Sequence, residues 1–217
     1  MLSLLFSPET RGQFKVLCLG AHADDIEIGC GGTVLRLAEE MPGMAVQWVV
    51  FSGAGVRQAE AQASASAFLE GVCNKKIDVL DFRDGYFPFQ GADIKDYFEV
   101  LKRSFNPSLV LTHWRGDAHQ DHRFVADLTH NTFRDHLVLE YEIPKYDGDI
   151  GNPAFFVPLA RTQARRKVEM IAQNFPSQLG RNWFSAETFL AMARLRGVNC
   201  NAPEGLAEAF YVNKIVF

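Results

Sequence analysis

The feature that most constrains the fold of this chain is a regular alternation of short apolar runs with longer segments whose apolar residues recur at helical spacing. Joining successive strands by helices requires parallel strands, with right-handed crossovers and helices on both faces of one sheet. We therefore predict an α/β fold, a Rossmann-like three-layer sandwich with a mainly parallel sheet. The predicted strands are 14–20, 45–51, 76–81, 109–112 and 138–143, and the predicted helices between them are 33–40, 57–69, 94–104 and 122–136.

The remainder of the chain is less regular. A loop rich in Pro, Gly and Asp extends to Pro158, and it is followed by predicted helices at 162–174 and 187–196 and a last predicted strand at 211–216. The sequence contains no internal repeat and no evident linker. A length of 217 residues suits one core, so we expect a single domain over residues 1–217.

Composition narrows the class of protein. Hydrophobic residues make up 47% of the chain and the formal net charge is −4. This balance argues against nucleic acid as a partner, apart from one local basic cluster formed by Arg161, Arg165, Arg166 and Lys167. No apolar run approaches the roughly 20 residues that span a bilayer, and the first 14 residues include no basic leader before their apolar start. We therefore expect a cytoplasmic location.

The four cysteines are too widely spaced for a disulfide framework or a thiolate zinc site. Cys18, Cys30, Cys73 and Cys200 include no CxxC pair. We interpret them as buried thiols. Cys30 is the one that could instead be exposed, because it lies near the stretch that carries the first motif.

The first motif follows the first predicted strand, in the stretch GAHADDIEIGCGG. In open α/β sheets, ligands bind beyond the carboxyl ends of the strands. An imidazole and a carboxylate three residues apart, His22 and Asp25, suit a zinc-like metal. The alternatives are a solvated acidic loop that caps the next helix, and a dinucleotide loop, which the missing GxGxxG and the two carboxylates exclude. We expect Gly29, Gly31 and Gly32 to permit a tight backbone path and close helix packing.

The second motif is WRGDAHQDHR, directly after the predicted strand that ends near His113. His119 and His122 are spaced to point from one first helical turn into the same crevice. For His113 two interpretations stay open, a residue of the site and a residue that only ends the strand. In a sheet ordered 3-2-1-4-5, strands one and four flank the switch point. The two motifs are therefore predicted to face each other across one cleft.

At these residues the chain resembles the LmbE-like or PIG-L-like zinc-dependent N-acetylglucosaminyl deacetylases, whose motifs AHPDD and HxDH read AHADD and HQDH here. The resemblance extends in order to Arg57 and Glu60, an R-x-x-E helix, and to Lys167 with the segment Pro176-Ser177-Gln178. One departure is Ala23 in place of the family proline, which removes a fixed φ but no ligand.

The resemblance implies a role for each matching residue. His22, Asp25 and His122 are expected to bind Zn²⁺, or another divalent metal such as Fe²⁺, and Asp24 to act as general base. His119, in protonated form, is expected to stabilise the oxyanion. Asp121 would tune His119 or the metal site, and Arg57 would face the substrate.

The implied reaction is removal of acetyl from an N-acetylated amino sugar or its conjugate. The alternatives are a hydrolase of a different amide conjugate and a non-catalytic metal-binding or sugar-binding protein. A 2-His-1-carboxylate iron oxygenase is disfavoured by the alternating α/β pattern. Aromatic residues at 86–89 and 183–184 could stack on a sugar, although packing in the core or a lid explains most of them as well. The loop at 145–158 is interpreted as a lid or as a contact of a homo-oligomer.

Overall fold

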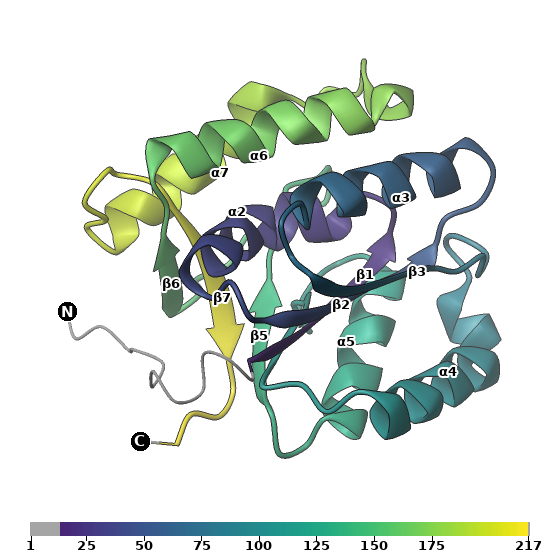
Figure 1. The fold of residues 1–217 in the computed structure, drawn as a ribbon. Coiled ribbons are helices and arrows are strands. Elements are labelled where there is room, and N and C mark those ends of the chain that lie inside the picture. The colour runs from purple at the N-terminus through teal and green to yellow at the C-terminus, as the bar shows by residue number, and fades with distance from the viewer. Residues whose placement is uncertain (1–13, 217) are drawn as a thin grey trace.

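A single seven-stranded sheet forms the centre of the computed structural model, which describes residues 14–216. Its strand order is β3-β2-β1-β4-β5-β7-β6 (Figure 1), and the first five strands in this order run parallel to one another. The strands β7 and β6 add an antiparallel edge beside β5. Their bounds are β1 Lys15–His22, β2 Ala45–Ser52, β3 Asn74–Val79, β4 Leu109–His113, β5 Leu137–Tyr141, β6 Phe155–Pro158 and β7 Ala207–Val212.

Helices cover both faces of this sheet (Figure 1). On one face lie α4 (Gly91–Ser104) and α5 (Gln120–Thr132), and on the other lie α2 (Asp25–Glu40) and α3 (Val56–Phe68). The helix α6 (Arg161–Asn174) packs outside α2 and α3, and α7 (Ala186–Asn199) packs against β7 and α6. Two 3-10 turns, η1 (Phe87–Gln90) and η2 (Pro176–Gln178), complete the described elements. The predicted α/β class and mainly parallel sheet are confirmed.

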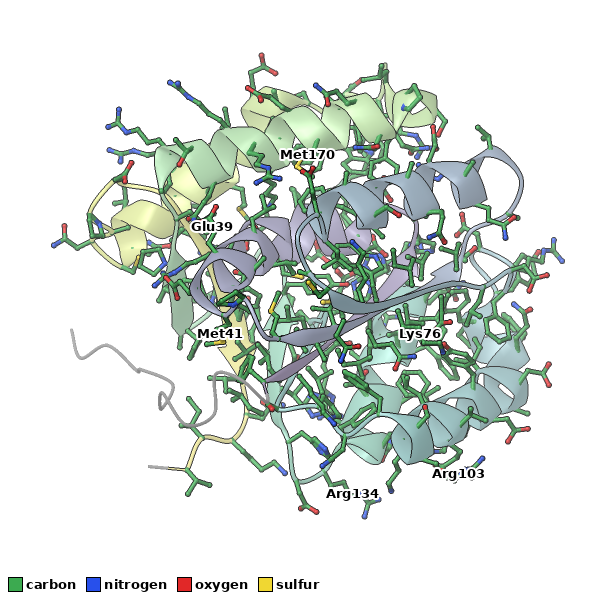
Figure 2. The ribbon with its side chains drawn as sticks, in the orientation of Figure 1. Glu39, Met41, Lys76, Arg103, Arg134 and Met170 are labelled. Atoms are coloured by element: carbon green, nitrogen blue, oxygen red, sulfur yellow. The ribbon has the colours of Figure 1, made fainter. Side chains whose placement is uncertain are left out.

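The core is divided between the two faces of the sheet, because successive side chains of a strand point to opposite sides. On β1, Val16 and Cys18 belong to the cluster under α2 and α3, whereas Leu17 and Leu19 belong to the cluster under α4 and α5. A strand buried on both faces reads as a continuous apolar run, which is why the central strands could be recognised from sequence. Figure 2 shows these side chains filling the space between the layers, while Arg103 and Arg134 extend outward.

The structure corrects several predicted boundaries after residue 113. The helix predicted at 122–136 runs from Gln120 to Thr132, and the strand predicted at 211–216 runs from Ala207 to Val212. The segment Phe155–Pro158, which we had assigned to a loop, forms β6. Both late strands pair antiparallel, so their place in the sheet comes from partners distant in sequence rather than from the βα alternation.

Gly29, Gly31 and Gly32 of the first motif lie inside α2, not in a loop before it. Close packing is confirmed as their role. A Cβ on Gly29 would lie 2.1 Å from Tyr141, and one on Gly31 would lie 2.6 Å from Phe68. Larger residues here would push the helix away from the sheet that positions the motif.

Two other expectations change. Cys18, Cys30 and Cys200 are buried as predicted, but Cys73 is exposed. The basic cluster loses Lys167, which is buried against Glu208, whereas Arg161, Arg165 and Arg166 are exposed. The predicted features of the first 13 residues lie outside the described residues. Among residues 14–216, no helix is long and apolar enough to cross a membrane.

Candidate metal and catalytic site

The two sequence motifs meet at the carboxyl ends of β1 and β4, which are parallel neighbours in the sheet. The strand β1 ends at His22, and α2 begins at Asp25. His119 is the N-cap of α5, and His122 lies in its first turn. The sheet order therefore brings together residues about a hundred positions apart, as predicted.

Three ligand-type atoms converge here: Nδ1 of His22, Oδ2 of Asp25 and Nε2 of His122. The two nitrogens are 3.1 Å apart, and they lie 3.3 and 3.5 Å from the carboxylate oxygen. Ligands about 2.0 Å from a tetrahedral zinc ion lie about 3.3 Å from one another. The spacing of these atoms therefore fits a zinc-sized cation.

The outer partners of the two histidines leave the converging nitrogens free to bind a cation. His22 directs Nε2 to the carboxylates of Asp84 and Asp121, at 3.0 and 3.4 Å. His122 donates from Nδ1 to Asp117, at 3.0 Å. A carboxylate on the outer nitrogen is the usual support of a metal-binding histidine, because it sets the tautomer and the ring orientation. Both rings therefore turn a lone pair toward the same point.

The two rings have opposite pKa shifts. Burial tends to lower the pKa of His22, but the carboxylates of Asp25, Asp121 and Asp84 outweigh it and raise that pKa well above its usual value. Burial, together with the nearby His113, lowers the pKa of His122 to about 4. The two rings in contact therefore favour one positive charge between them, carried by His22.

Three other groups of ligand-type atoms share residues with this one. One joins the outer nitrogen of His22 to Asp84 and Asp121, and the other two add His119 or His113. Nδ1 of His119 accepts the backbone N–H of Asp121, and Nε2 of His113 accepts the backbone N–H of Ala21. His119 therefore carries its proton on Nε2, and His113 supports the end of β1.

Asp24 lies beside these atoms and is 4% exposed. Its Oδ1 accepts from Arg57 at 2.8 Å, and its Oδ2 has no hydrogen-bond partner within residues 14–216. Burial raises the pKa of Asp24, and the Arg57 guanidinium opposes that shift. Glu60 lies 3.4 Å from Arg57 and accepts both the N–H and the hydroxyl of Ser177. The R-x-x-E helix and the Pro-Ser-Gln turn thus form one network behind Asp24.

On the opposite side, Asp117 holds the second histidine. Its Oδ2 accepts from His122 and from Lys145, both at 3.0 Å, and its Oδ1 accepts the backbone N–H of His119. Lys145 also binds Asp149. Burial tends to raise the pKa of Asp117, but His122 and Lys145 hold it well below its usual value. Our sequence prediction missed Asp117, although it lies within the quoted motif, and missed Lys145, which no motif marks.

The carboxylate of Asp121 contacts the segment at Gly85 and Phe87, whereas only the backbone N–H of Asp121 binds the ring of His119. This carboxylate accepts the backbone N–H groups of Gly85 and Phe87, at 2.6 and 3.1 Å, and it is fully buried. Gly85 has a φ of 77°, a conformation that favours glycine. Asp121 therefore fixes the loop that carries Asp84 against His22.

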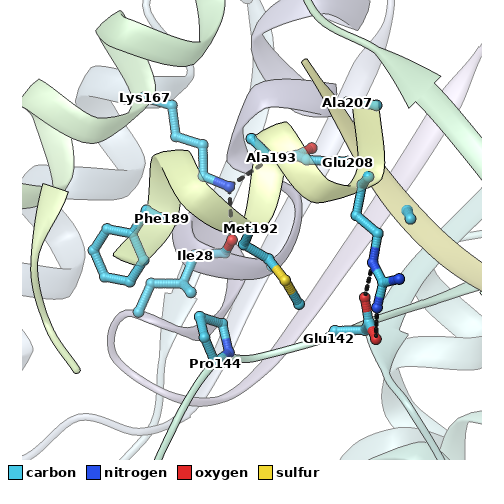
Figure 3. A pocket seen from close by; sticks show the side chains of 12 residues that line it. Ile28, Glu142, Pro144, Lys167, Phe189, Met192, Ala193, Ala207 and Glu208 are labelled. Carbon is cyan, nitrogen blue, oxygen red and sulfur yellow. Dashed lines mark hydrogen bonds and ion pairs between the residues drawn. The ribbon is translucent and has the colours of Figure 1, made fainter. Parts of the chain in front are cut away.

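Behind the motif, a buried ion pair braces α2. Lys167 donates to Glu208 at 2.6 Å and to the carbonyl of Ile28 at 2.7 Å (Figure 3). Glu208 also accepts the backbone N–H groups of Gly32 and Thr33. The cavity in Figure 3 has a volume of about 30 Å³, the space of one water molecule, and none of the converging ligand-type atoms lines it. The ion pair therefore supports α2, and the cavity is too small to hold a substrate.

Comparison with known proteins identifies the family. The sequence model of the PIG-L family, described as GlcNAc-PI de-N-acetylase, matches residues 17–133, which is more than half of the chain and includes both motifs. The chain belongs to the PIG-L family. The predicted resemblance is therefore confirmed.

Within this family, one relative is the diacetylchitobiose deacetylase of Thermococcus kodakarensis, 30% identical over 130 residues. The match covers 52% of this chain and 47% of the relative, so the chain spans about half the length of that protein. The E. coli protein named uncharacterized deacetylase YaiS is 32% identical over 139 residues, which cover 59% of this chain and 74% of the length of that protein.

Solved structures of low sequence identity share the fold. N,N'-diacetylchitobiose deacetylase from Pyrococcus horikoshii matches with a TM-score of 0.71 at 21% identity, over 96% of this chain and 87% of its own. GalB, the 4-carboxy-2-hydroxymuconate hydratase from Pseudomonas putida, matches with a TM-score of 0.73 at 18% identity, over 94% and 98%. A deacetylase and a hydratase thus both have this architecture, so the reaction must be argued from the site.

Proposed function

We propose that this protein is a metal-dependent hydrolase that removes acetyl from an N-acetylated amino sugar or its conjugate. The observation that carries the proposal is the convergence of two histidine nitrogens and one carboxylate oxygen beside a buried carboxylate with a free oxygen. Membership of a de-N-acetylase family supports the amide bond as the target.

We assign metal binding to His22, Asp25 and His122, with Zn²⁺ as the expected ion and Fe²⁺ as the alternative. Three protein ligands leave a coordination position open, which is typical of catalytic rather than structural sites. When bound, the metal supplies Lewis acidity toward a water and the amide carbonyl.

Asp24 is the proposed general base. Its Oδ1 is held by Arg57, while Oδ2 has no partner among the described residues and is available to accept a proton from water. The same oxygen can then return the proton to the leaving amine. The ion pair with Arg57 keeps the carboxylate oriented without occupying this oxygen.

His119 is the proposed oxyanion donor. Because its Nδ1 accepts the N–H of Asp121, Nε2 carries a hydrogen in both the neutral and the charged ring. Burial, followed by the charge of His22, lowers the pKa of His119. We therefore propose a neutral donor here, in place of the protonated ring expected from sequence. A preorganised donor of this kind contributes to catalysis without any change of charge.

Arg57 is proposed to meet the substrate as well as Asp24, since its side chain is 22% exposed at the edge of the site. Asp121 acts by positioning His22 and the loop at Gly85. We further propose a single domain over residues 1–217 and a cytoplasmic location, and we leave a homo-oligomer open.

Two rival functions remain distinct in their chemistry. A hydrolase of another amide conjugate would use the same residues, and the shared fold of GalB adds a hydratase as the second rival. The buried Asp24 with a free oxygen disfavours a protein that only binds metal or sugar, because metal binding alone does not require it.

The test is acetate release from a panel of N-acetylated sugars, with and without a chelator and after zinc is restored. We expect acetate from at least one sugar, lost with chelator and regained with zinc. Release of a different acid from acyl variants only would support the other amide hydrolase. Turnover unaffected by complete metal removal would overturn the proposal.

A further inference from the structure

A second groove lies beside α5, outside the candidate metal and catalytic site. It has a volume of about 420 Å³, within the range of about 300–1,000 Å³ that is typical of small-molecule sites. Its walls come from the segment after β4, from α5, β5 and the end of β7, and from the segment before β6. Of the residues assigned above to metal binding or catalysis, none lines it. We call it the side groove, and its lining includes Trp114, Arg115, Asp127, Glu140, Asn152 and Tyr211.

The base of the side groove is a buried carboxylate that joins three of these segments. Glu140, on β5, is 2% exposed. Its Oε2 accepts the backbone N–H of Arg115 at 2.8 Å, and its Oε1 pairs with His130 of α5 at 2.8 Å and with Asn213 at 2.9 Å. The segments around the groove are therefore held together before any ligand binds, which lowers the entropy cost of binding.

One wall of the side groove is a stacked aromatic pair. The ring centroids of Trp114 and Tyr211 are 4.4 Å apart, with 8° between the ring planes, and both residues are half-buried. Glu140 and Tyr211 lie directly opposite each other on β5 and β7, so their side chains project from the same face of the sheet. A Cβ on Gly116 would overlap Trp114, and one on Gly151 would overlap the hydroxyl of Tyr211. The two glycines therefore let the backbone close on the pair, which forms a rigid apolar surface.

The outer part of the side groove carries polar groups without a protein partner. Nε of Arg115 binds Oδ1 of Asp127 at 3.0 Å, which leaves both Nη atoms of Arg115 and Oδ2 of Asp127 unpartnered among residues 14–216. Within the same residues, the side-chain amide of Asn152 and Oδ1 of Asn213 also have no partner. These groups are a mixture of donors and acceptors. With one guanidinium and the two carboxylates of Asp127 and Glu140, the lining has a net negative charge.

We propose that the side groove binds a short neutral carbohydrate, at a site separate from the proposed catalytic centre. A hydroxyl group both donates and accepts, so it pairs with each kind of unpartnered group in the lining. The apolar C–H face of a sugar ring packs on an aromatic surface such as the Trp114–Tyr211 pair. The negative lining disfavours phosphorylated and carboxylated ligands. This inference goes beyond the proposed function and does not depend on deacetylation.

The experiment is calorimetric titration of the zinc-loaded protein with cellotriose, maltotriose and mannotriose, which have no acetamido group for the proposed reaction. The first variant is Ala154→Trp, because an indole at this exposed position would fill the groove and leave its hydrogen-bonding side chains in place. Ala191→Trp is the matched control, at an exposed position of α7 that does not line the groove. A second pair is Asn152→Ala and its control Asn182→Ala, an exposed residue outside the groove.

We expect at least one of the trisaccharides to bind the wild type and both controls with equal affinity. Binding should weaken by about tenfold or more in Ala154→Trp, and by about threefold to tenfold in Asn152→Ala, which loses one hydrogen-bonding group. An absence of binding by all three trisaccharides would overturn the proposal. Equal affinity in each variant and its control would overturn it as well, because the sugar would then bind elsewhere.

Two further measurements test the class of ligand and the separateness of the site. Tighter binding of trigalacturonic acid than of the neutral trisaccharides would overturn the neutral class. Acetate release from N-acetylated sugars should be the same in Ala154→Trp and Ala191→Trp, and a loss in Ala154→Trp alone would show that the groove belongs to the substrate site. Acetate release that is absent from every protein, with trisaccharide binding that follows the groove variants, contradicts the deacetylase function and supports the side groove.

Discussion

The two sides of the candidate site use the same ion-pair arrangement for different ends. On one side, Arg57 lies between Asp24 and Glu60, and on the other, Lys145 lies between Asp117 and Asp149. Asp117 binds the outer nitrogen of a ligand-type histidine, whereas Asp24 keeps an oxygen without a partner among the described residues. We therefore propose that the first side serves proton transfer and that the second serves metal binding. Breaking each side should produce a different defect.

The largest effect is expected at Asp24. Asp24→Ala removes the proposed base, and general acid–base groups contribute about 10²–10⁴-fold to rate. We expect turnover to fall by about that factor while bound metal is retained, as measured by acetate release and metal analysis on the same sample. Normal turnover in a metal-loaded variant would contradict the assignment of the base.

The second largest effect is expected at the buried Lys167–Glu208 ion pair, which supports α2. Lys167→Met leaves Glu208 buried without its cation, and breaking a buried pair costs about 3–5 kcal/mol. Urea unfolding should show a loss of that size in the free energy of unfolding. The control is Arg166→Met, because Arg166 pairs with Glu70 on the surface and should contribute less than about 1 kcal/mol. Equal losses in the two variants would show that burial of the Lys167 pair has no special importance.

On the metal-binding side, Asp117→Asn should weaken zinc binding by about 10–100-fold, because it removes the charged partner of His122. The measurement is competition with a chromophoric chelator. Asp127→Asn is the matched control, since Asp127 pairs with Arg115 at the surface and should leave zinc affinity unchanged. An unaltered zinc affinity in Asp117→Asn would contradict the proposal that this side of the site serves metal binding.

The smallest effect is expected at Glu60. Glu60→Gln keeps the shape of the side chain but removes the charge that faces Arg57 and accepts from Ser177. We expect kcat/KM to fall by about tenfold or less, with zinc affinity unchanged, because the Gln amide can still hydrogen-bond and a typical hydrogen bond contributes about 0.5–1.5 kcal/mol. A loss of zinc rather than of turnover would place Glu60 on the metal-binding side instead.

Much of the fold and the core of the site could be predicted because their signals are local. The apolar runs of β1 and β4 mark buried parallel strands, and strand order then requires the loops after them to meet. The glycines of α2 look like loop residues in sequence. Only their contacts with Tyr141 and Phe68 reveal that close packing within a helix requires them.

The remaining features depend on contacts distant in sequence. Lys145 binds Asp117 across 28 positions from a segment without a motif, and Asp84 reaches His22 from the loop after β3. The strand β6 forms by antiparallel pairing with β7, and an alternation of strands and helices in the sequence does not predict such a pair. The proposed donor role of Nε2 of His119 rests on an N-cap hydrogen bond to Nδ1 that sequence spacing alone does not define.

The most direct test of this account is a zinc titration of the wild type with His22→Ala, His122→Ala and His119→Ala. We predict one zinc per wild-type chain, loss of stoichiometric binding in His22→Ala and His122→Ala, and retention of zinc in His119→Ala, whose ring nitrogen accepts a backbone N–H instead. Loss of zinc in His119→Ala with retention in His22→Ala would contradict the assigned ligands and the mechanism built on them.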